Sequence, residues 1–199
     1  LAVPNDWHKP YAVKALIAGK NVISEKPVTL CSSDLQEMID AANKSGKLFT
    51  VHQNRRWDED FLTVKKIYNE GILGDIFSIE SRVHGSRGIP GDWRKEKAKG
   101  GGMMLDWGVH LLDQILQIIP EKVSTVYAKM HHITNVEVDD GFRMILNFES
   151  GKTVLVEVGT SNFINMPRWY VQGENGTALI QNFSSDAQVV NITSWDNSD

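Results

Sequence analysis

The period of the hydrophobic pattern changes near residue 53, and this change constrains the fold more than any single motif. Before it, two helical stretches, "NDWHKPYAVKALIAGK" and a run beginning at Ser33, alternate with the short apolar strands "NVIS" and "LFTV". Such alternation is typical of parallel α/β winding. After it, one helical stretch gives way to strands with alternating apolar residues. The sequence therefore predicts an α/β unit over residues 1–52 and an α+β domain over residues 53–199.

The second part contains two pairs of alternating strands joined by turn sequences. The turns "ESGK" and "GENG" are typical of β-hairpins, so we expect a large antiparallel sheet. The apolar residues that face one another are Phe142, Met144, Leu146 and Phe148 with Val154, Val156 and Val158, and Trp169 and Val171 with Ala178 and Ile180. The last fifteen residues are polar and show no clear pattern.

Two helix starts carry capping patterns. Asp6 is the expected N-cap of the first helix, with Pro10 in its first turn and Gly19 at its end. Ser33 and Gln36 form a capping-box pattern for the second helix, which "KSG" should end.

The composition excludes several classes of protein. The chain has 199 residues, 41% of them apolar, and a net charge of −4 from 21 basic and 25 acidic residues. That balance argues against a nucleic-acid-binding or membrane-binding surface, and no apolar run is long enough to span a bilayer. Cys31 is the only cysteine, so we expect no internal disulfide and a cytoplasmic setting. His131 and His132 have no other metal-type partners in their strand pattern, so no metal site is expected.

The most informative stretch is "GGGMMLDWGVHLLDQIL", residues 100–116, where an otherwise apolar helix carries Asp106 and His110. Positions four apart lie on one face of an α-helix, so we expect the carboxylate and the imidazole to be neighbours. A solvated stripe on an amphipathic helix is the plain alternative. The stripe is narrower than an ordinary exposed face, however, which favours a proton-transfer pair beside a cleft.

Polar residues also surround the predicted strands of the first part. Glu25 and Lys26 follow "NVIS" directly, and a lysine at the carboxyl end of a strand can aim its ammonium at a substrate oxygen. A simple surface turn is the alternative. "PNDWH", residues 4–8, precedes the first helix at a turn that favours anionic ligand groups, although His8 could equally be a surface residue.

Two further stretches supply candidate substrate contacts. "HQNRRWDEDF" follows the strand "LFTV" and contains Arg56, which could instead be a structural clamp. "GDWRKEKAKGGG" is a basic, flexible loop before the Asp106 helix, so Trp93 and Arg94 could close over a substrate.

Taken together, these stretches resemble the Gfo/Idh/MocA family of NAD(P)-dependent oxidoreductases. The resemblance runs from "PNDWHKPYAVKALIAGKNVISEKP" through "HQNRRWDEDF", "LGDI" and "GGGMMLDWGVHLLD" to "ENGTALI", which is nearly the whole chain. It implies that residues 1–52 are part of a Rossmann-type dinucleotide-binding domain. It implies that residues 53–199 form a substrate-binding domain whose large, mostly antiparallel sheet is covered by helices on one face and forms homo-oligomers through the other.

The resemblance also implies roles for individual residues. The implied catalytic group is Lys26, Asp106 and His110, and the peptide bond before Pro27 is expected to be cis. The implied lining of the nicotinamide site is Pro4, Asn5, His8, Glu25 and Lys26. With the two stretches above, the expected substrate contacts are Arg56, Trp93, Arg94, Asp106 and His110.

The chain departs from the family pattern in one respect, because G-x-G-x-x-G occurs nowhere in it. That motif holds the cofactor's pyrophosphate in a dinucleotide-binding fold. We therefore expect a fragment of a longer protein, inactive by itself and binding NAD or NADP only very weakly without the part that it lacks.

Three functions are consistent with these features. The first is hydride transfer between a sugar or polyol alcohol carbon and NAD or NADP. The second is an NAD-dependent redox glycosidase of the same fold, and the third is a non-enzymatic, dimerising sheet domain. The products of a reaction would separate the first two, and the oligomeric state would test the third.

Overall fold

The computed structural model describes residues 1–194. Its first unit is a parallel pair of strands, β1 (Val22–Ser24) and β2 (Phe49–Val51), packed against the helices α1 (His8–Ile17) and α2 (Ser32–Ser45). A short 3-10 turn, η1 (Asn5–Trp7), precedes α1. The predicted α/β winding is confirmed, and its small hydrophobic core consists of Ala12, Leu16, Val22, Met38 and Ala41.

Two of the predicted helix caps are wrong. Trp7, and not Asp6, precedes α1, and no side chain caps it, because η1 already forms a hydrogen-bonded turn there. Cys31, and not Ser33, precedes α2, so the helix begins before the predicted capping box. The predicted end of α2 is correct, since Gly46 has a φ of 63°, a left-handed conformation that glycine adopts without strain.

The second unit is built on a seven-stranded sheet with the strand order β4-β5-β6-β3-β7-β8-β9. Neighbouring strands are antiparallel except β3 and β6, which are parallel. The strands are β3 (Ile76–His84), β4 (Val123–His131), β5 (Gly141–Phe148), β6 (Thr153–Gly159), β7 (Trp169–Gly173), β8 (Gly176–Ile180) and β9 (Ala187–Asn191). The other elements are α3 (Glu59–Asn69), α4 (Val109–Ile118), the 3-10 turns η2 (Asn54–Trp57), η3 (Trp93–Lys95) and η4 (Lys97–Lys99), and the π-helical turn η5 (Met104–Gly108). The predicted fold class, an α/β fragment followed by a domain with a large, mostly antiparallel sheet, is therefore confirmed.

The two predicted hairpins have the expected register. Met144 pairs with Val156 across the β5–β6 hairpin, and Val171 pairs with Ala178 across the β7–β8 hairpin. The strand β9 was not predicted, because the last fifteen residues are mostly polar and show no alternation, yet its backbone extends the sheet beside β8. Backbone pairing at a sheet edge makes few demands on side chains, so a weak hydrophobic pattern does not prevent it.

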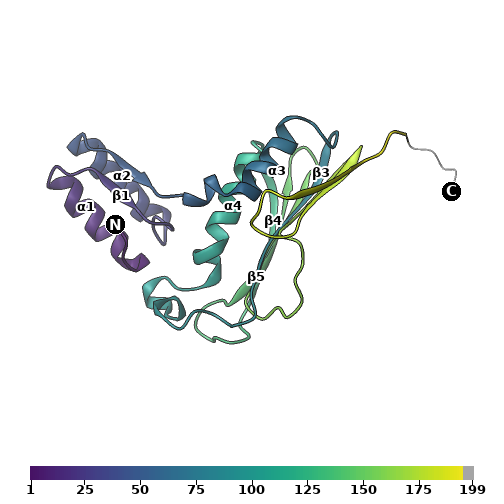
Figure 1. Ribbon diagram of the computed structural model, residues 1–199. Helices are drawn as coiled ribbons and strands as arrows, with labels where there is room; N and C mark the ends of the chain where they lie inside the picture. The colour runs from purple at the N-terminus through teal and green to yellow at the C-terminus, as the bar shows by residue number, and fades with distance from the viewer. Residues whose placement is uncertain (195–199) are drawn as a thin grey trace.

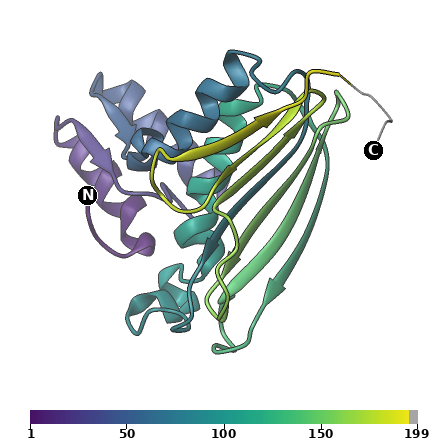
Figure 2. The ribbon, with the colours of Figure 1, turned by 45° about the vertical axis from the view of Figure 1, so that its right-hand side comes forward.

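The helices α3 and α4 both lie on one face of the sheet, as Figures 1 and 2 show from two directions. The main core lies between them and the sheet, and its largest fully buried side chains include Phe61, Leu111, Ile115, Phe142 and Trp169. Burying each such side chain contributes roughly 1.5–3 kcal/mol. Within residues 1–194, the opposite face of the sheet carries no helix.

Two classes of feature are missing from the part of the chain that the structure describes. No helix there has the length and the apolar surface needed to cross a membrane. No group of histidine, cysteine and acidic side chains there is arranged to hold a metal ion.

Candidate active site

A polar cavity of about 380 Å³ lies where the two units meet. The first unit contributes residues 2–5 before α1 and the two residues that follow β1, and the second unit contributes the η3 loop and the helix of Asp106. A cavity of this volume falls in the range of small-molecule sites. The structure thus brings together seven of the predicted site residues, namely Pro4, Asn5, Glu25, Lys26, Trp93, Arg94 and Asp106.

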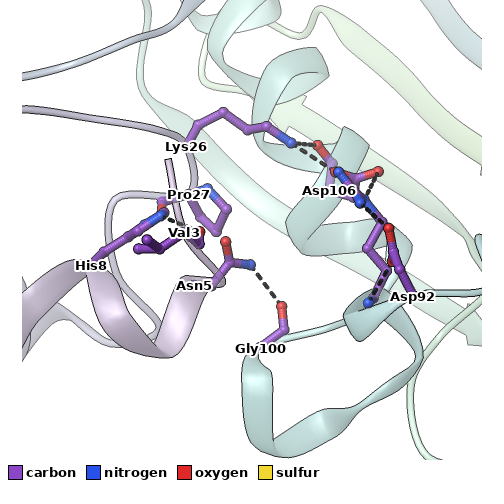
Figure 3. Close-up of polar contacts among 9 residues, drawn as sticks. Val3, Asn5, His8, Lys26, Pro27, Asp92, Gly100 and Asp106 are labelled. Atoms are coloured by element: carbon purple, nitrogen blue, oxygen red, sulfur yellow. Dashed lines mark hydrogen bonds and ion pairs between the residues drawn. The ribbon is translucent and has the colours of Figure 1, made fainter. Parts of the chain in front are cut away.

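Lys26 follows β1 and reaches across the cavity to Asp106 (Figure 3). Its Nζ donates to Asp106 Oδ1 at 2.9 Å and to the Asp106 carbonyl oxygen at 2.6 Å. The peptide bond between Lys26 and Pro27 is cis, as expected. Both side chains of the ion pair are 15% exposed, so the charges are partly shielded from water and still accessible to a ligand.

Asp106 has a second cationic neighbour in Arg94. The Nε of Arg94 lies 3.2 Å from Asp106 Oδ2, and another guanidinium nitrogen donates to Asp92 at 2.7 Å. Burial alone would raise the pKa of Asp106, but Lys26 and Arg94 outweigh burial and hold that pKa below its usual value. The carboxylate is therefore ionised at neutral pH and is shared by two cations.

His110 is buried on α4, and its Nδ1 has no hydrogen-bond partner within residues 1–194. Burial lowers the pKa of His110 to about 4, with the charges of Lys26 and Arg55 acting in the same direction. Asp106 and Asp113 act in the opposite direction and do not restore the usual value. The ring is therefore uncharged at neutral pH, which is the form that can accept a proton.

The expected contact between Asp106 and His110 is not formed in the described structure, because the Asp106 carboxylate is turned toward Lys26 and Arg94. The prediction assumed α-helical geometry through both residues. Instead, η5 has the wider hydrogen-bonded turn of a π-helix, in which residues four apart no longer lie directly over one another. The carboxylate therefore supports the lysine directly and acts on the histidine only through its charge.

Asn5 and His8 position the walls of the cavity. Asn5 Nδ2 donates to the Gly100 carbonyl oxygen at 2.8 Å, which joins the first unit to the loop before the Asp106 helix (Figure 3). The His8 ring lies behind the wall, with Nδ1 2.8 Å from the Pro27 carbonyl and Nε2 3.0 Å from the Val3 carbonyl. His8 therefore braces two segments that line the cavity and does not itself line it.

Glu25 is held by a residue that the sequence did not single out. Its Oε1 lies 2.8 Å from His52 Nδ1, just past the end of β2. Burial would raise the pKa of Glu25, but the hydrogen bond with His52 helps to bring it below its usual value. The two strand ends of the first unit are thus joined beside the cavity.

Arg56 lies outside the cavity. Its guanidinium makes two hydrogen bonds to the Asp113 carboxylate, at 2.8 and 2.6 Å, and its side chain is 48% exposed. Arg56 therefore fits the alternative of a structural clamp, here between η2 and α4. It is not among the residues that line the cavity, where the predicted substrate contacts lie.

The neighbouring Arg55 lies closer to the predicted catalytic histidine. Its Cζ is 4.1 Å from the centroid of the Trp107 ring, and Trp107 meets His110 edge to face with ring centroids 6.1 Å apart. Phe183 packs against Trp107 at 5.9 Å between centroids. These residues come from three separate segments, so no spacing rule within one segment could have found the group.

Comparisons with known proteins agree with this fold. A family model described as the GFO/IDH/MocA C-terminal domain matches residues 61–179, and one described as an oxidoreductase family with an NAD-binding Rossmann fold matches residues 1–53. The crystal structure of an NAD-binding protein from Listeria innocua is 53% identical, with a TM-score of 0.94, and the match covers 96% of this chain and 57% of that one.

Some of the curated relatives have named activities. A scyllo-inositol 2-dehydrogenase (NADP(+)) of Bacillus subtilis is 31% identical over 181 residues, which cover 90% of this chain and 50% of the relative. A 2,7-anhydro-N-acetylneuraminate hydratase of Escherichia coli is 30% identical over 189 residues, again 90% of this chain and 50% of the relative. The chain spans about half the length of these relatives. Since one family model matches the first unit and the other matches residues 61–179, which include most of the large sheet, the chain belongs to the Gfo/Idh/MocA family of oxidoreductases.

Proposed function

We propose that the protein to which this chain belongs transfers a hydride between a sugar or polyol CH–OH group and NAD or NADP. The observation that carries the proposal is the contact of Lys26 with Asp106 at 2.9 Å, made across a cavity of about 380 Å³. The activity named for the Bacillus subtilis relative, on a cyclic polyol, supports the substrate class.

Four residues on the first unit's side would hold the nicotinamide end of the cofactor, namely Pro4, Asn5, Glu25 and Lys26. Glu25 and Lys26 follow the carboxyl end of β1, where open α/β sheets bind their ligands, and Pro4 and Asn5 line the same cavity from the segment before α1. When bound, the nicotinamide supplies the hydride acceptor. His8 would keep this wall in place through its contacts with the Val3 and Pro27 carbonyls.

The chain's own residues would manage the proton and the developing charge. In the oxidation, the O–H bond of the substrate breaks and its proton passes to a ring nitrogen of His110, while the C–H electron pair leaves as hydride and a C=O bond forms. Lys26 would donate a hydrogen bond to the same oxygen and stabilise its negative charge. Asp106 keeps the ammonium of Lys26 directed into the cavity.

Trp93 and Arg94 would contact the rest of the substrate from the opposite wall. The Arg94 guanidinium lies over the Trp93 ring, with its Cζ 4.8 Å from the ring centroid, so the two side chains form one surface. A planar guanidinium beside an aromatic ring suits the hydroxyl groups and apolar faces of a sugar or polyol.

The test uses the full-length protein with a panel of sugars and polyols and with NAD or NADP. One reduced cofactor for each ketone formed is the expected stoichiometry. No cofactor reduction with any member of the panel would refute the dehydrogenase assignment.

A second candidate is a reaction without net oxidation, such as redox-assisted glycosidic cleavage. The named hydratase activity of the Escherichia coli relative favours it, because hydration also leaves the oxidation level unchanged overall. Release of an aglycone, or formation of a hydrated product, without accumulation of NADH would support this candidate over the first.

We also propose that the open face of the sheet binds a second copy of the chain. Tyr127, Ile145 and Leu155 are paired neighbours on β4, β5 and β6, and Tyr127 is 64% exposed. On the other side of β3, Tyr170 and Leu179 are paired in the same way. Glu80 on β3 lies between these two groups, so the face carries two apolar patches on either side of one acidic side chain. Apolar patches on a helix-free sheet face are typical of an interface. Light scattering at low protein concentration should show a dimer or larger oligomer, and a monomer would contradict the proposal.

A further inference from the structure

We propose that Arg55 is a positioning residue for His110, because its guanidinium packs on Trp107, the ring that meets the imidazole edge to face, and its charge opposes a second positive charge at the imidazole. This inference rests on the proposed role of His110 as the proton acceptor. It assigns a function to one member of the arginine pair in "HQNRRWDEDF", and it gives the other member, Arg56, no part in the site.

The first support is an unbroken series of contacts among three side chains. The Arg55 Cζ lies 4.1 Å from the centroid of the Trp107 ring, within the range of a cation–π contact. The edge of Trp107 then meets His110, with an interplanar angle of 67° and ring centroids 6.1 Å apart. The guanidinium therefore reaches the imidazole through one aromatic ring, without a direct hydrogen bond.

The second support is that Arg55 is tied to the helix that carries His110. Gln114, one turn further along α4, donates from Nε2 to the Arg55 carbonyl oxygen at 2.8 Å. The Oε1 of the same Gln114 accepts from the buried Arg168 at 2.8 Å, so the amide is held at both ends. Because η2 and α4 are joined in this way, Arg55 and His110 are positioned by one network.

The third support is that the Arg55 side chain has a defined place of its own. Its guanidinium donates to Asp58 at 2.8 Å, and its Cζ lies 5.4 Å from the centroid of the Phe183 ring. Phe183 and Trp107 pack against one another, and both lie near the cation. A guanidinium held by an ion pair and by neighbouring aromatic rings loses little further freedom when the site is occupied.

Four charged groups act on the His110 ring from the elements packed around it. Lys26 and Arg55 disfavour its protonation, while Asp106 and Asp113 favour it. Each of these groups also has a partner of opposite charge, Lys26 with Asp106, Arg55 with Asp58 and Asp113 with Arg56. Burial is the largest cause, the charges of Lys26 and Arg55 add to it, and the pKa of His110 falls to about 4.

The chemical consequence concerns the proton that leaves the substrate hydroxyl. A protonated imidazole has no free lone pair and cannot accept that proton, whereas a neutral one can. Removing the Arg55 charge should let a larger fraction of the rings become protonated as the pH falls. The site would then lose its base at a higher pH than the unaltered protein does.

The experiment is an NMR titration of the histidine side chains in the 199-residue chain, which requires neither cofactor nor substrate. Arg55→Met keeps much of the side chain's length and its packing on Trp107 but removes the charge, and Arg87→Met, at an exposed arginine in the loop after β3, is the control for loss of a positive charge elsewhere. Comparison with His110→Gln assigns the resonance. We expect the His110 midpoint to rise by about one unit in Arg55→Met and to stay within about 0.3 unit in Arg87→Met.

An unchanged midpoint in Arg55→Met, or an equal rise in both variants, would overturn the proposal. If Arg55→Met does not fold, as judged by circular dichroism, Arg55→Gln replaces it under the same criteria. Arg55→Lys separates charge from stacking, because it should keep the low midpoint if the charge acts on the ring. Since the titration does not depend on turnover, its result stands apart from whether the dehydrogenase assignment is correct.

Discussion

Lys26 and Asp106 lie 80 positions apart in the sequence and meet at 2.9 Å, Nζ to Oδ1. Lys26 follows β1 in the first unit, and Asp106 lies in η5 of the second unit, so the ion pair joins the two units at the cavity. Arg94 approaches the other carboxylate oxygen. One acidic group therefore fixes the positions of two cations that face the same space.

The Asp106 carboxylate should contribute to the stability of the 199-residue chain. Asp106→Asn leaves Lys26 and Arg94 without their shared counter-charge, and we expect a loss of about 1.5–3 kcal/mol in the free energy of unfolding, the range for hydrogen bonds to charged groups. Urea denaturation measures it. The matched control is Asp92→Asn, which removes a more exposed partner of Arg94 and should cost less than about 1 kcal/mol. Equal losses in the two variants would contradict the inferred role.

Glu157 should make the folded chain sensitive to acid. Burial would raise the pKa of Glu157, but its contacts with His84 and Arg143 outweigh burial and lower that pKa to about 2. A carboxyl group whose pKa is lower in the folded state stabilises that state above its unfolded pKa, near 4.5, and the stabilisation is lost as the pH falls toward 2. The free energy of unfolding should therefore fall across this window, and Glu157→Gln should reduce the slope.

The control for this titration is Glu149→Gln, which alters an exposed ion pair with Lys122 beyond the end of β5. Urea denaturation at a series of pH values between about 2.5 and 6 measures the free energy of unfolding of the unaltered chain, of Glu157→Gln and of Glu149→Gln. This range covers most of the interval between the folded and the unfolded pKa of Glu157. If Glu157→Gln keeps the full acid dependence of the unaltered chain, then the contacts of Glu157 with His84 and Arg143 are not the source of that dependence.

His110→Ala should separate proton transfer from cofactor binding in the full-length protein. His110 does not line the wall assigned to the nicotinamide, so the KM for NAD or NADP should change little. Loss of a general base lowers turnover by roughly 10²–10⁴-fold. Steady-state kinetics measure both quantities, with the exposed His132→Ala as the control. Unchanged turnover in His110→Ala would remove His110 from the mechanism.

Local sequence patterns predict the backbone of this chain well where one face of an element is buried. Val154 and Val156 alternate with less buried neighbours, and this pattern fixed the register of β6 correctly. The parallel pairing of β3 with β6 was not predicted, because it joins segments that no turn connects. The same limit applies to the candidate site, because local patterns do not predict contacts between distant segments. The family resemblance grouped Pro4 and Asn5 with Glu25 and Lys26, and all four line the cavity. The group of Arg55, Trp107 and Phe183 depends on tertiary packing that no local pattern shows.

The missing contact between Asp106 and His110 shows why residue spacing alone could not predict the geometry of the site. An interval of four residues implies contact only if the helix has α-helical geometry throughout, and η5 does not. The sequence "GGGMMLDWG" gives no signal for a π-helical turn that we could have used. The residues of the proposed catalytic group were therefore named from the resemblance, while the contacts among them required the structure.

The 199-residue chain by itself should bind NADH and NADPH only weakly. In a dinucleotide-binding fold the pyrophosphate is held by the amides of a glycine-rich loop at a helix N-terminus, and no G-x-G-x-x-G motif occurs in this sequence. The contacts that the chain offers are those of Pro4, Asn5, Glu25 and Lys26, and each hydrogen bond contributes roughly 0.5–1.5 kcal/mol. A few such contacts do not offset an association cost of about 4–15 kcal/mol, so the Kd should be about 1 mM or weaker. Calorimetric titration of the isolated chain with each dinucleotide measures this Kd. Lys26→Met should change the Kd little, because the affinity of the unaltered chain is already low. Saturable binding in the micromolar range would show that the residues around the cavity hold the cofactor without a glycine-rich loop.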